Sequence, residues 1–595
     1  MSGQAESGAP GKRDRMETGE KEARKRYETW LQSPVFDQDT KRELEMLKGD
    51  AAEITDRFYR ELEFGTGGLR GLLGSGSNRM NRYTVRKATQ GLANYIRKEH
   101  GEEKGVAIAY DSRRLSPELA EEAALCLAAN GIRAYVFESL RPTPELSFAL
   151  RELGCTAGIV VTASHNPPEY NGYKVYWEDG AQITFPRDSE IIREVSEITD
   201  YGQARTMSLE EAREQGLYQV IGREIDDRYI EEIRKLSIHP EIIREQGKDL
   251  KIVYTPLHGT GNLPVRRILK ELGFQKVWVV PEQEKPDGGF PTVSYPNPED
   301  KKAFVLALQL AGEVDADLVL ATDPDADRLG IYGKNTQTGE YEPFTGNMSG
   351  MIILEYLLSQ KKRLGRLPAD GAVVTTIVSG KMSREITRAY GADLIETLTG
   401  FKYIGEQIRL FEENGEHEFL FGYEESYGCL TGTHARDKDA VSAVAMLCEA
   451  AAYYRHEGIT LCQQMDRLYE KYGYYREDLC TVAMKGIEGA AKIRELMETI
   501  RKDPPERIGP WRVQSFRDYE TGKVMDRAAG EIRDTGLLRS NVLYFELEDM
   551  GWCCVRPSGT EPKVKFYMGV RGESREDAQE KLECLTQEVR RIAGE

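Results

Sequence analysis

Residues 157–167 read AGIVVTASHNP, an apolar run of five residues followed at once by a short polar loop. The run from Ala157 to Val161 has the length and the β-branched content of a buried strand. The loop then carries a serine, a histidine and an amide side chain, at Ser164, His165 and Asn166. In open α/β sheets, ligands bind beyond the carboxyl ends of the strands. We therefore interpret this loop as a site that holds a reactive hydroxyl group.

Short β-rich runs recur on both sides of this stretch, and amphipathic segments rich in Leu and Glu separate them. Such alternation is typical of layered α/β folds. Several of the runs end in a polar or glycine-bearing loop, and we expect these loops to line one cleft. The expected strands are 106–110, 134–137, 157–161, 250–254, 277–280, 318–321, 372–378 and 419–421.

Length and composition limit the class of protein. A chain of 595 residues is too long for one hydrophobic core, so we expect about three to five domains. Hydrophobic residues make up 40% and charged residues 30% of the chain, close to the average of soluble proteins. No apolar run reaches the roughly 18 residues of a membrane-spanning helix, and no secretion signal opens the chain. We therefore expect a soluble protein with a partly disordered tail at residues 1–30.

Charge and cysteine usage narrow the partners further. The net charge of −18 repels a polyanion, which argues against nucleic acid as a partner. A local group of Arg and Lys side chains can still bind a small phosphorylated metabolite within an acidic protein. The nine cysteines form no CxxC pair, which argues against a zinc site and against a disulfide framework. The composition therefore predicts reduced thiols, a cytoplasmic location, and neither nucleic acid nor a membrane as a partner.

A second polar loop, ATDPDADR, places carboxylates at every second residue after the apolar run at 318–321. Asp323, Asp325 and Asp327 would repel one another strongly, so a bound cation is the natural way to keep all three ionised. An EF-hand is excluded, because this chain has Arg and Lys where that loop needs Gly and Glu. Hard oxygen ligands beside a phosphate favour Mg²⁺. A solvent-exposed acidic turn is the structural alternative.

Ser164 alone leaves several interpretations open. A serine is a poor nucleophile without a neighbouring base, positive field or metal, and His165 follows it directly. An acyl hydrolase would need a GxSxG turn, and those glycines are absent here. Ser and Asn also serve as turn and capping residues, so a purely structural role stays open.

Further strings supply groups suited to a phosphorylated sugar. A glycine-rich run precedes Arg70, and Arg113 lies in another polar loop, so either guanidinium could contact an anion. Glu424 and Ser426 could accept hydrogen bonds from sugar hydroxyls. RPSGTEP, at residues 556–562, combines a guanidinium, two hydroxyls and backbone amides, which suits either a bound phosphate or an ordinary turn.

Taken together and in order, these strings resemble the α-D-phosphohexomutase superfamily, in its phosphoglucomutase and phosphomannomutase branch. The match runs from about residue 64 to about residue 567 and includes FGTGGLR, TASHNP, TPLHGTG, DPDADR, GYEESYG, RDKD and RPSGT. The resemblance implies three similar α/β domains with mixed sheets and a fourth, smaller C-terminal α+β domain, arranged around a central cleft. The expected parts are a phosphoserine domain at 31–225, a metal-binding domain at 226–338, a sugar-binding domain at 339–473 and a phosphate-binding domain at 474–595.

The resemblance also implies roles for individual residues. Ser164 is implied as the carrier of the transferable phosphate, and the further catalytic residues implied are His165, Lys438 and Arg70. One Mg²⁺ per chain is implied, with ligands from a phosphoserine oxygen at Ser164 and from Asp323, Asp325 and Asp327. The implied substrate-binding residues are Arg328, Lys174, Thr399, Gly400, Lys402, Glu424, Ser426, Arg556, Ser558, Gly559 and Thr560.

Two of these assignments carry a reservation. Tyr423 separates Gly422 from the glutamates, which leaves the register of Glu424 against Glu425 open. Lys438 needs a lowered pKa if it is to act as a base, and a salt-bridged helix start is its structural alternative.

The implied activity is the interconversion of glucose 1-phosphate and glucose 6-phosphate through a phosphoserine enzyme, with glucose 1,6-bisphosphate as intermediate and primer. Phosphomannomutase and phosphopentomutase activities stay open, because FGTGGLRG and the chain length also resemble the branch that includes phosphopentomutases. A sugar-phosphate-binding protein without catalysis and a phosphatase that uses the same serine are the competing classes. The expected partners are small-molecule sugar phosphates, and the expected state is a monomer or weak dimer.

Overall fold

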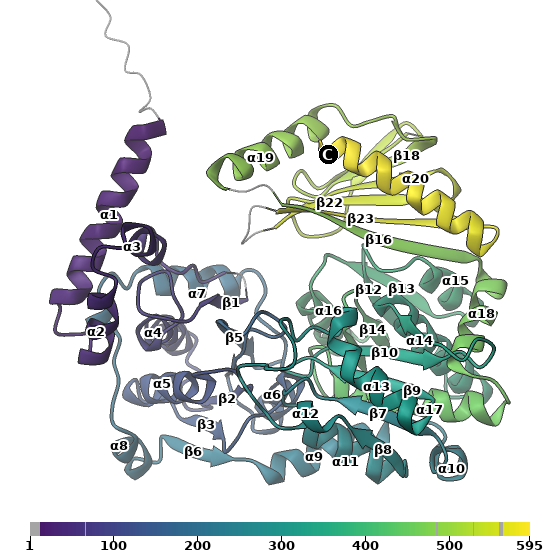
Figure 1. The fold of residues 1–595 in the computed structure, drawn as a ribbon, viewed down its shortest axis with the longest axis horizontal. Helices are drawn as coiled ribbons and strands as arrows, with labels where there is room; N and C mark the ends of the chain where they lie inside the picture. The colour runs from purple at the N-terminus through teal and green to yellow at the C-terminus, as the bar shows by residue number, and fades with distance from the viewer. Residues whose placement is uncertain (1–11, 66, 484–485, 528, 559–562, 595) are drawn as a thin grey trace, which may run out of the picture.

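The computed structural model describes residues 12–65, 67–483, 486–527, 529–558 and 563–594 (Figure 1). Its strands form four sheets that follow one another along the chain. Three sheets mix parallel and antiparallel pairs, and the last is antiparallel throughout. The expected architecture of three α/β domains and a smaller C-terminal α+β domain is confirmed. Among these residues, no helix combines the length and the apolar composition needed to cross a bilayer.

The first sheet carries the serine loop. Its strands are β1 (Gly68–Leu72), β2 (Val106–Tyr110), β3 (Ala134–Phe137), β4 (Ala157–Val161), β5 (Tyr170–Trp177) and β6 (Tyr218–Ile221), in the spatial order β1-β5-β4-β2-β3-β6. β4 lies inside this sheet and is buried along its whole length, as its apolar sequence predicts. The main helices are α4 (Arg82–Lys98), α5 (Ser116–Ala129), α6 (Thr143–Glu152) and α7 (Arg187–Ser196).

The second sheet carries the loop with the three aspartates. It contains β7 (Lys251–Thr255), β8 (Lys276–Val279), β9 (Leu318–Thr322), β10 (Leu329–Lys334) and β11 (Tyr341–Phe344), in the order β11-β10-β9-β7-β8. β9 is central and fully buried, so the aspartates begin where a core strand ends. The main helices are α9 (Arg223–Lys235), α11 (Asn262–Leu272) and α13 (Val305–Val314).

The third sheet positions the predicted sugar loop. Its strands are β12 (Gly371–Thr376), β13 (Asp393–Thr397), β14 (Glu418–Tyr423) and β15 (Cys429–Thr431), in the order β13-β12-β14-β15. β12 ends at Thr376, two residues before the predicted end, because the N–H of Ser379 donates to the carbonyl of Thr376 and closes a turn. The helices are α14 (Gly346–Arg363), α15 (Met382–Tyr390), α16 (Phe401–Asn414), α17 (Ala440–His456) and α18 (Leu461–Tyr472).

The fourth sheet lies next to the third one in space (Figure 1). It contains β16 (Tyr474–Ala483), β18 (Trp511–Asp518), β19 (Lys523–Asp526), β20 (Glu531–Asp534), β21 (Leu543–Leu547), β22 (Trp552–Pro557) and β23 (Lys563–Gly572) in the order β16-β23-β22-β21-β18-β19-β20, and β17 (Arg507–Ile508) pairs with β18. Helices α19 (Gly486–Lys502) and α20 (Arg575–Ala593) pack against it. A shared apolar cluster joins it to the third domain, through Ile377, Leu398, Tyr544, Trp552 and Tyr567.

Three helices precede the first sheet: α1 (Lys12–Gln32), α2 (Gln38–Met46) and α3 (Ala51–Phe58). Ion pairs such as those of Arg79 with Asp56 and of Arg82 with Asp37 join them to the rest of the chain, as does an aromatic cluster in which the rings of Trp30 and Phe36 stack with centroids 4.0 Å apart. Tyr83 of α4 meets both rings edge-on. The aromatic burial therefore fixes these helices to α4.

Replacement of Trp30 by Ala should loosen this attachment. Loss of a buried aromatic side chain of this size costs about 3–5 kcal/mol, so hydrogen exchange in α1 to α3 should become much faster. The control is Met46→Ala, since Met46 lies in the same helical segment and is 80% exposed. Equal exchange rates in the two variants, measured by mass spectrometry, would show that the cluster does not hold the helices.

Candidate active site

The serine loop is bent sharply where β4 ends. Ser164 is buried and has a φ of 52°, in the left-handed region that non-glycine residues rarely adopt. The hydroxyl of Thr162 accepts a hydrogen bond from the Ser164 N–H at 2.7 Å and donates to Asp111 at 2.6 Å. Gly172 on β5 leaves room for the bend, because a Cβ there would lie 2.4 Å from the Thr162 carbonyl oxygen. The conformation of Ser164 is therefore imposed by its surroundings.

Arg113 fixes the conformation of the serine loop. Its buried guanidinium donates to the carbonyl oxygens of Pro167 at 2.8 Å, Tyr170 at 3.0 Å, Ser164 at 2.6 Å, and also Asn166. Every one of these acceptors belongs to the serine loop or to the start of β5. Arg113 therefore shapes the loop, whereas Arg70 is exposed and donates to Asn166 Oδ1 at 3.1 Å.

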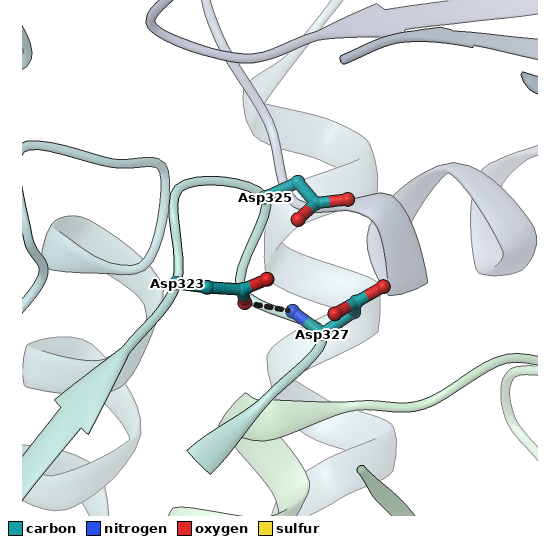
Figure 2. Close-up of side chains that lie close together, drawn as sticks. All are labelled: Asp323, Asp325 and Asp327. Atoms are coloured by element: carbon teal, nitrogen blue, oxygen red, sulfur yellow. Dashed lines mark hydrogen bonds between the residues drawn. The ribbon is translucent and has the colours of Figure 1, made fainter. Parts of the chain in front are cut away.

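The three aspartates converge in the loop after β9. One carboxylate oxygen of each lies within 4.8 Å of the others, and the exposed fraction is 0% for Asp323 and Asp325 and 2% for Asp327 (Figure 2). Asp323 Oδ1 accepts from the backbone N–H groups of Asp327 and Arg328, and its Oδ2 accepts from Ser164 Oγ at 2.9 Å. The serine hydroxyl is therefore in direct contact with the acidic cluster.

This cluster fits a cation. Within the described part of the chain, Asp325 Oδ1 and Asp327 Oδ1 are buried and have no hydrogen-bond partner. Burial, with the neighbouring charges of Asp327 and Asp325, raises the pKa of Asp323 well above its ordinary value. A hard divalent ion would coordinate the two carboxylate oxygens that lack hydrogen bonds. It would also stabilise the ionised form of Asp323.

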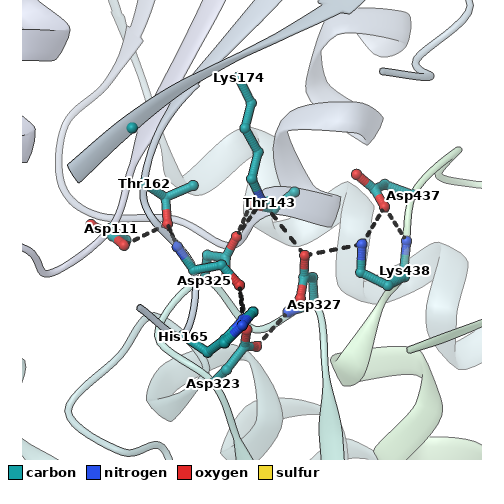
Figure 3. A network of polar contacts seen from close by, with 12 residues as sticks. Asp111, Thr143, Thr162, His165, Lys174, Asp323, Asp325, Asp327, Asp437 and Lys438 are labelled. Carbon is teal, nitrogen blue, oxygen red and sulfur yellow. Dashed lines mark hydrogen bonds and ion pairs between the residues drawn. The ribbon is translucent and has the colours of Figure 1, made fainter. Parts of the chain in front are cut away.

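Two lysines flank the aspartates (Figure 3). Lys174 Nζ lies 2.8 Å from Asp325 Oδ2, and Lys438 Nζ lies 3.2 Å from Asp327 Oδ2 and 3.0 Å from Asp437 Oδ1. Burial alone would lower the pKa of each ammonium group, but the adjacent carboxylates outweigh burial and raise both pKa values. Lys438 is therefore protonated in this setting, which is the opposite of what a base at this position would need.

His165 and Arg328 complete the phosphate side of the site. His165 Nδ1 lies 3.1 Å from Ser164 Oγ, and burial, together with Arg328 and Arg70, lowers the pKa of His165 well below its ordinary value. The ring is therefore neutral. Arg328 pairs with Glu299, and its buried Nε makes no hydrogen bond among the described residues, although it lies 3.8 Å from Asp327 Oδ1. A buried guanidinium N–H without a hydrogen bond suits a phosphate oxygen.

The predicted sugar loop meets the start of α16. Glu424 accepts the Gly400 N–H at 3.0 Å, while Glu425 accepts from the hydroxyl of Thr376 at 3.2 Å. Burial and the charge of Glu424 raise the pKa of Glu425 to about 7. The two glutamates thus have different surroundings, and Glu424 is the one that contacts the Gly400 loop.

Other predicted substrate residues gather near this loop. Thr399 Oγ1 is buried and has no partner among the described residues, and Lys402 Nζ lies 3.8 Å from Asp188. Burial lowers the pKa of Lys402 despite the opposing charges of Asp188 and Glu406. Arg556 lies on β22 of the fourth domain, which packs beside this loop through the apolar cluster that includes Leu398 and Trp552. Ser426 is half-buried, Ser558 follows β22 directly, and Gly559 and Thr560 lie outside the described residues.

Sequence reasoning missed two members of the site. Thr143, at the start of α6, donates its hydroxyl to Asp325, and Asp437 holds both Lys438 and the hydroxyl of Tyr176. Asp437 lies within RDKD, so that string did carry a signal. Thr143 follows a turn after β3, far from every quoted string, and nothing in its local sequence points to a site.

Comparisons with known proteins match the chain along most of its length. Family models described as phosphoglucomutase/phosphomannomutase alpha/beta/alpha domains I, II and III match residues 61–202, 227–338 and 345–472, and the C-terminal domain model matches 520–585. A phosphoglucomutase of Staphylococcus epidermidis is 37% identical over 86% of this chain and 90% of its own. One from Staphylococcus aureus is 35% identical over 90% of this chain and 94% of its own.

Solved structures show the same fold at lower identity. A phosphoglucomutase/phosphomannomutase family protein from Burkholderia thailandensis has a TM-score of 0.62 and 19% identity, covering 89% of this chain and 96% of its own. The phosphoprotein parafusin from Paramecium, in its open form, has a TM-score of 0.67 and 18% identity, covering 90% of this chain and 96% of its own.

Replacement of Arg113 by Met should release the serine loop. Removal of one partner from a buried ion pair costs about 3–5 kcal/mol, because Asp111 and the loop carbonyls lose their donor. Hydrogen exchange at residues 162–170 should rise sharply, as should proteolytic cleavage there. Arg114→Met is the matched control, since that neighbouring arginine is exposed. A loop that stays equally protected in both variants would contradict the assignment.

Proposed function

Because this chain belongs to the phosphoglucomutase/phosphomannomutase family, we propose that it interconverts glucose 1-phosphate and glucose 6-phosphate. Family membership makes the chain an enzyme of the mutase class, which is a class of isomerases. Glucose phosphates are proposed as substrates because relatives that are 35% and 37% identical over most of the chain are named phosphoglucomutase. Mannose and pentose phosphates therefore rank below glucose as substrates.

One observation carries the proposal. Ser164 Oγ lies 2.9 Å from a carboxylate of the buried aspartate cluster and 3.1 Å from a neutral histidine ring. A serine that only capped a turn would not need this setting. Phosphoryl transfer relies mainly on positioning and on stabilisation of negative charge, and the groups around Ser164 suit both tasks.

We propose one Mg²⁺ per chain at the aspartate cluster. Asp323, Asp325 and Asp327 would hold it, together with an oxygen of the phosphate on Ser164. Their donor set is all oxygen, which this ion prefers, and the two orphaned carboxylate oxygens support it. Bound there, the ion would supply positive charge to the oxygens of the transferring phosphoryl group.

In the proposed first step, phosphorylated Ser164 gives its phosphoryl group to the free hydroxyl of a sugar monophosphate. The bond between phosphorus and Oγ breaks, and a bond between phosphorus and the sugar oxygen forms. The sugar hydroxyl loses a proton and Oγ gains one, and His165 is the side chain positioned to pass it on. Lys438, which is held between two carboxylates, would stabilise negative charge rather than act as a base.

In the second step the glucose 1,6-bisphosphate turns end for end and returns its other phosphate to Ser164. The same bisphosphate serves as primer when Ser164 is unphosphorylated. Water must be excluded, because hydrolysis of either phosphate species would end the cycle. We assign the sugar hydroxyls to Glu424 and Ser426. We assign the binding of the phosphate groups of the substrate to Arg328, Lys174, Arg70 and the loops at 399–402 and 556–560. Which of these binds the phosphate that is not being transferred depends on the half-reaction.

The setting of the enzyme is proposed on chemical grounds. All nine cysteines lie among the described residues and none of them forms a disulfide there, which supports a reducing compartment such as the cytoplasm. The net charge of −18 supports small phosphorylated sugars rather than nucleic acid as partners. We propose that the chain works there as a monomer or weak dimer.

Replacement of Ser164 by Ala should abolish isomerisation of glucose 1-phosphate, since no oxygen remains to carry the phosphate. Intact-mass analysis should find one phosphate on the wild-type peptide with Ser164, which substrate removes, and none on the variant. The control is Ser196→Ala, because Ser196 is exposed on α7. Full activity of the Ser164 variant would overturn the proposal, and steady release of inorganic phosphate by the wild type would indicate a phosphatase instead.

Substrate choice is tested by parallel assays with the 1-phosphates of glucose, mannose and ribose. We expect the highest kcat/KM for glucose 1-phosphate. If the protein bound all of them and converted none in the presence of Mg²⁺ and bisphosphate, it would be a binding protein.

Removal of divalent cations should stop the reaction and destabilise the fold, because three buried carboxylates would repel one another. Added Mg²⁺ should raise the melting temperature, since a ligand at about 100 times its Kd stabilises the folded state by about 2.7 kcal/mol. The Asp325→Asn variant should show a much smaller rise. An equal rise in both proteins would place the cation elsewhere.

A further inference from the structure

Thr143 is a buried threonine at the first position of α6, in the first α/β domain. We propose that it is a positioning residue for the cation site of the second domain: its hydroxyl fixes the rotation of the Asp325 carboxylate, so that the opposite oxygen faces the bound ion. The inference rests on the proposed function, because it takes for granted that the aspartate cluster binds a divalent cation.

Thr143 donates two hydrogen bonds to Asp325. Its hydroxyl donates to Asp325 Oδ2 at 2.8 Å, and its backbone N–H donates to the Asp325 carbonyl oxygen at 2.9 Å (Figure 3). The first contact fixes the side chain, and the second fixes the backbone that carries it. Both donors belong to a residue 182 positions away in sequence, in another domain.

The contact leaves the two oxygens of Asp325 in different states. Oδ2 accepts from Thr143 and from Lys174, each at 2.8 Å. Oδ1 is buried and has no partner among the described residues. A carboxylate with one oxygen saturated by two donors cannot rotate without breaking both hydrogen bonds. Oδ1 is therefore held in place as the oxygen of Asp325 that is left for a cation.

Lys174 alone would fix this carboxylate less well. Its ammonium group also lies 3.6 Å from Asp327 Oδ2, so it is shared between two acids. Among the described residues, the Thr143 hydroxyl donates to Asp325 alone, through a short side chain with a single rotatable bond to its hydroxyl oxygen. Among the described contacts, the threonine hydroxyl is therefore the donor that is specific to this ligand.

Thr143 is itself held rigidly. Pro142 precedes it as the N-cap residue with its φ fixed by the ring at −57°, and Pro144 follows it in the first turn of the helix. Arg141 donates to both carboxylate oxygens of Asp226 on α9, at 2.7 Å and 2.9 Å. The turn before α6 is thus anchored by a bidentate ion pair, and the threonine cannot easily follow a displaced Asp325.

The test is the affinity for Mn²⁺, measured in the full-length protein from the electron paramagnetic resonance signal of free Mn²⁺. Loss of an outer-shell hydrogen bond typically weakens metal binding about 10- to 100-fold, so Thr143→Val should raise the Kd for Mn²⁺ at least about 10-fold. Thr143→Ser keeps the hydroxyl and should stay within about twofold of wild type. The Mg²⁺ concentration for half-maximal activity should shift in parallel, while kcat at saturating Mg²⁺ should change little.

Thr156→Val is the matched control, because Thr156 is also buried in the first domain and donates its hydroxyl to a carbonyl, that of Gly101. Its Mn²⁺ affinity should equal that of wild type. If Thr143→Val failed to fold, Thr143→Ala would remove the hydroxyl without the branched side chain.

The outcomes separate the two proposals. Wild-type Mn²⁺ affinity in the Val and Ala variants would overturn the inference and leave the proposed function standing, as would an equal loss in the Ser variant. A wild-type protein that bound no Mn²⁺ would overturn the cation site of the proposed function, and the inference with it.

Discussion

The proposed cation site depends on one electrostatic constraint: three carboxylates would have to be ionised side by side in a buried pocket. Burial and mutual repulsion both oppose this, and they raise the pKa of Asp323 well above its usual value. Hydrogen-bond donors or ammonium groups contact one oxygen or more of each acid and offset part of this cost. Backbone N–H groups and Ser164 bind Asp323, and lysines bind the other two. The oxygens left open, on Asp325 and Asp327, are where a divalent ion would complete the balance.

The same constraint explains why the site lies where domains meet. The acids follow β9 in the second domain, Ser164 and Lys174 come from the first, and Lys438 comes from the third. Side-chain hydrogen bonds cross these junctions, such as those from Thr143 to Asp325 and from Tyr176 to Asp437. Each domain can form its own sheet, but the pocket exists only when all three are docked. Closely packed domains with buried polar contacts between them therefore serve the chemistry as well as stability.

The sequence predicted what is local and left open what is long-range. The apolar runs at 106–110, 134–137 and 157–161 predicted β2, β3 and β4 with the observed bounds, because a run of four or five apolar residues is enough to recognise a buried strand. The DPDADR spacing was enough to expect a cation, because repulsion between near neighbours needs no tertiary information. The contacts of Thr143 could not be foreseen, since they join residues from two domains. The protonation of Lys438 depends likewise on Asp327, which lies more than a hundred residues earlier in the chain.

The balance of charge also decides which group can move a proton. Lys174 and Lys438 each lie within reach of two carboxylates, which keeps both ammonium groups protonated. A base must be unprotonated before the reaction, and these carboxylate contacts favour the protonated form of both lysines. His165 is surrounded by cations instead, at Arg328 and Arg70, and is neutral for that reason and because it is buried. In the proposed mechanism, the acids that would hold the cation therefore keep both lysines charged, and proton transfer at Ser164 would fall to the imidazole of His165.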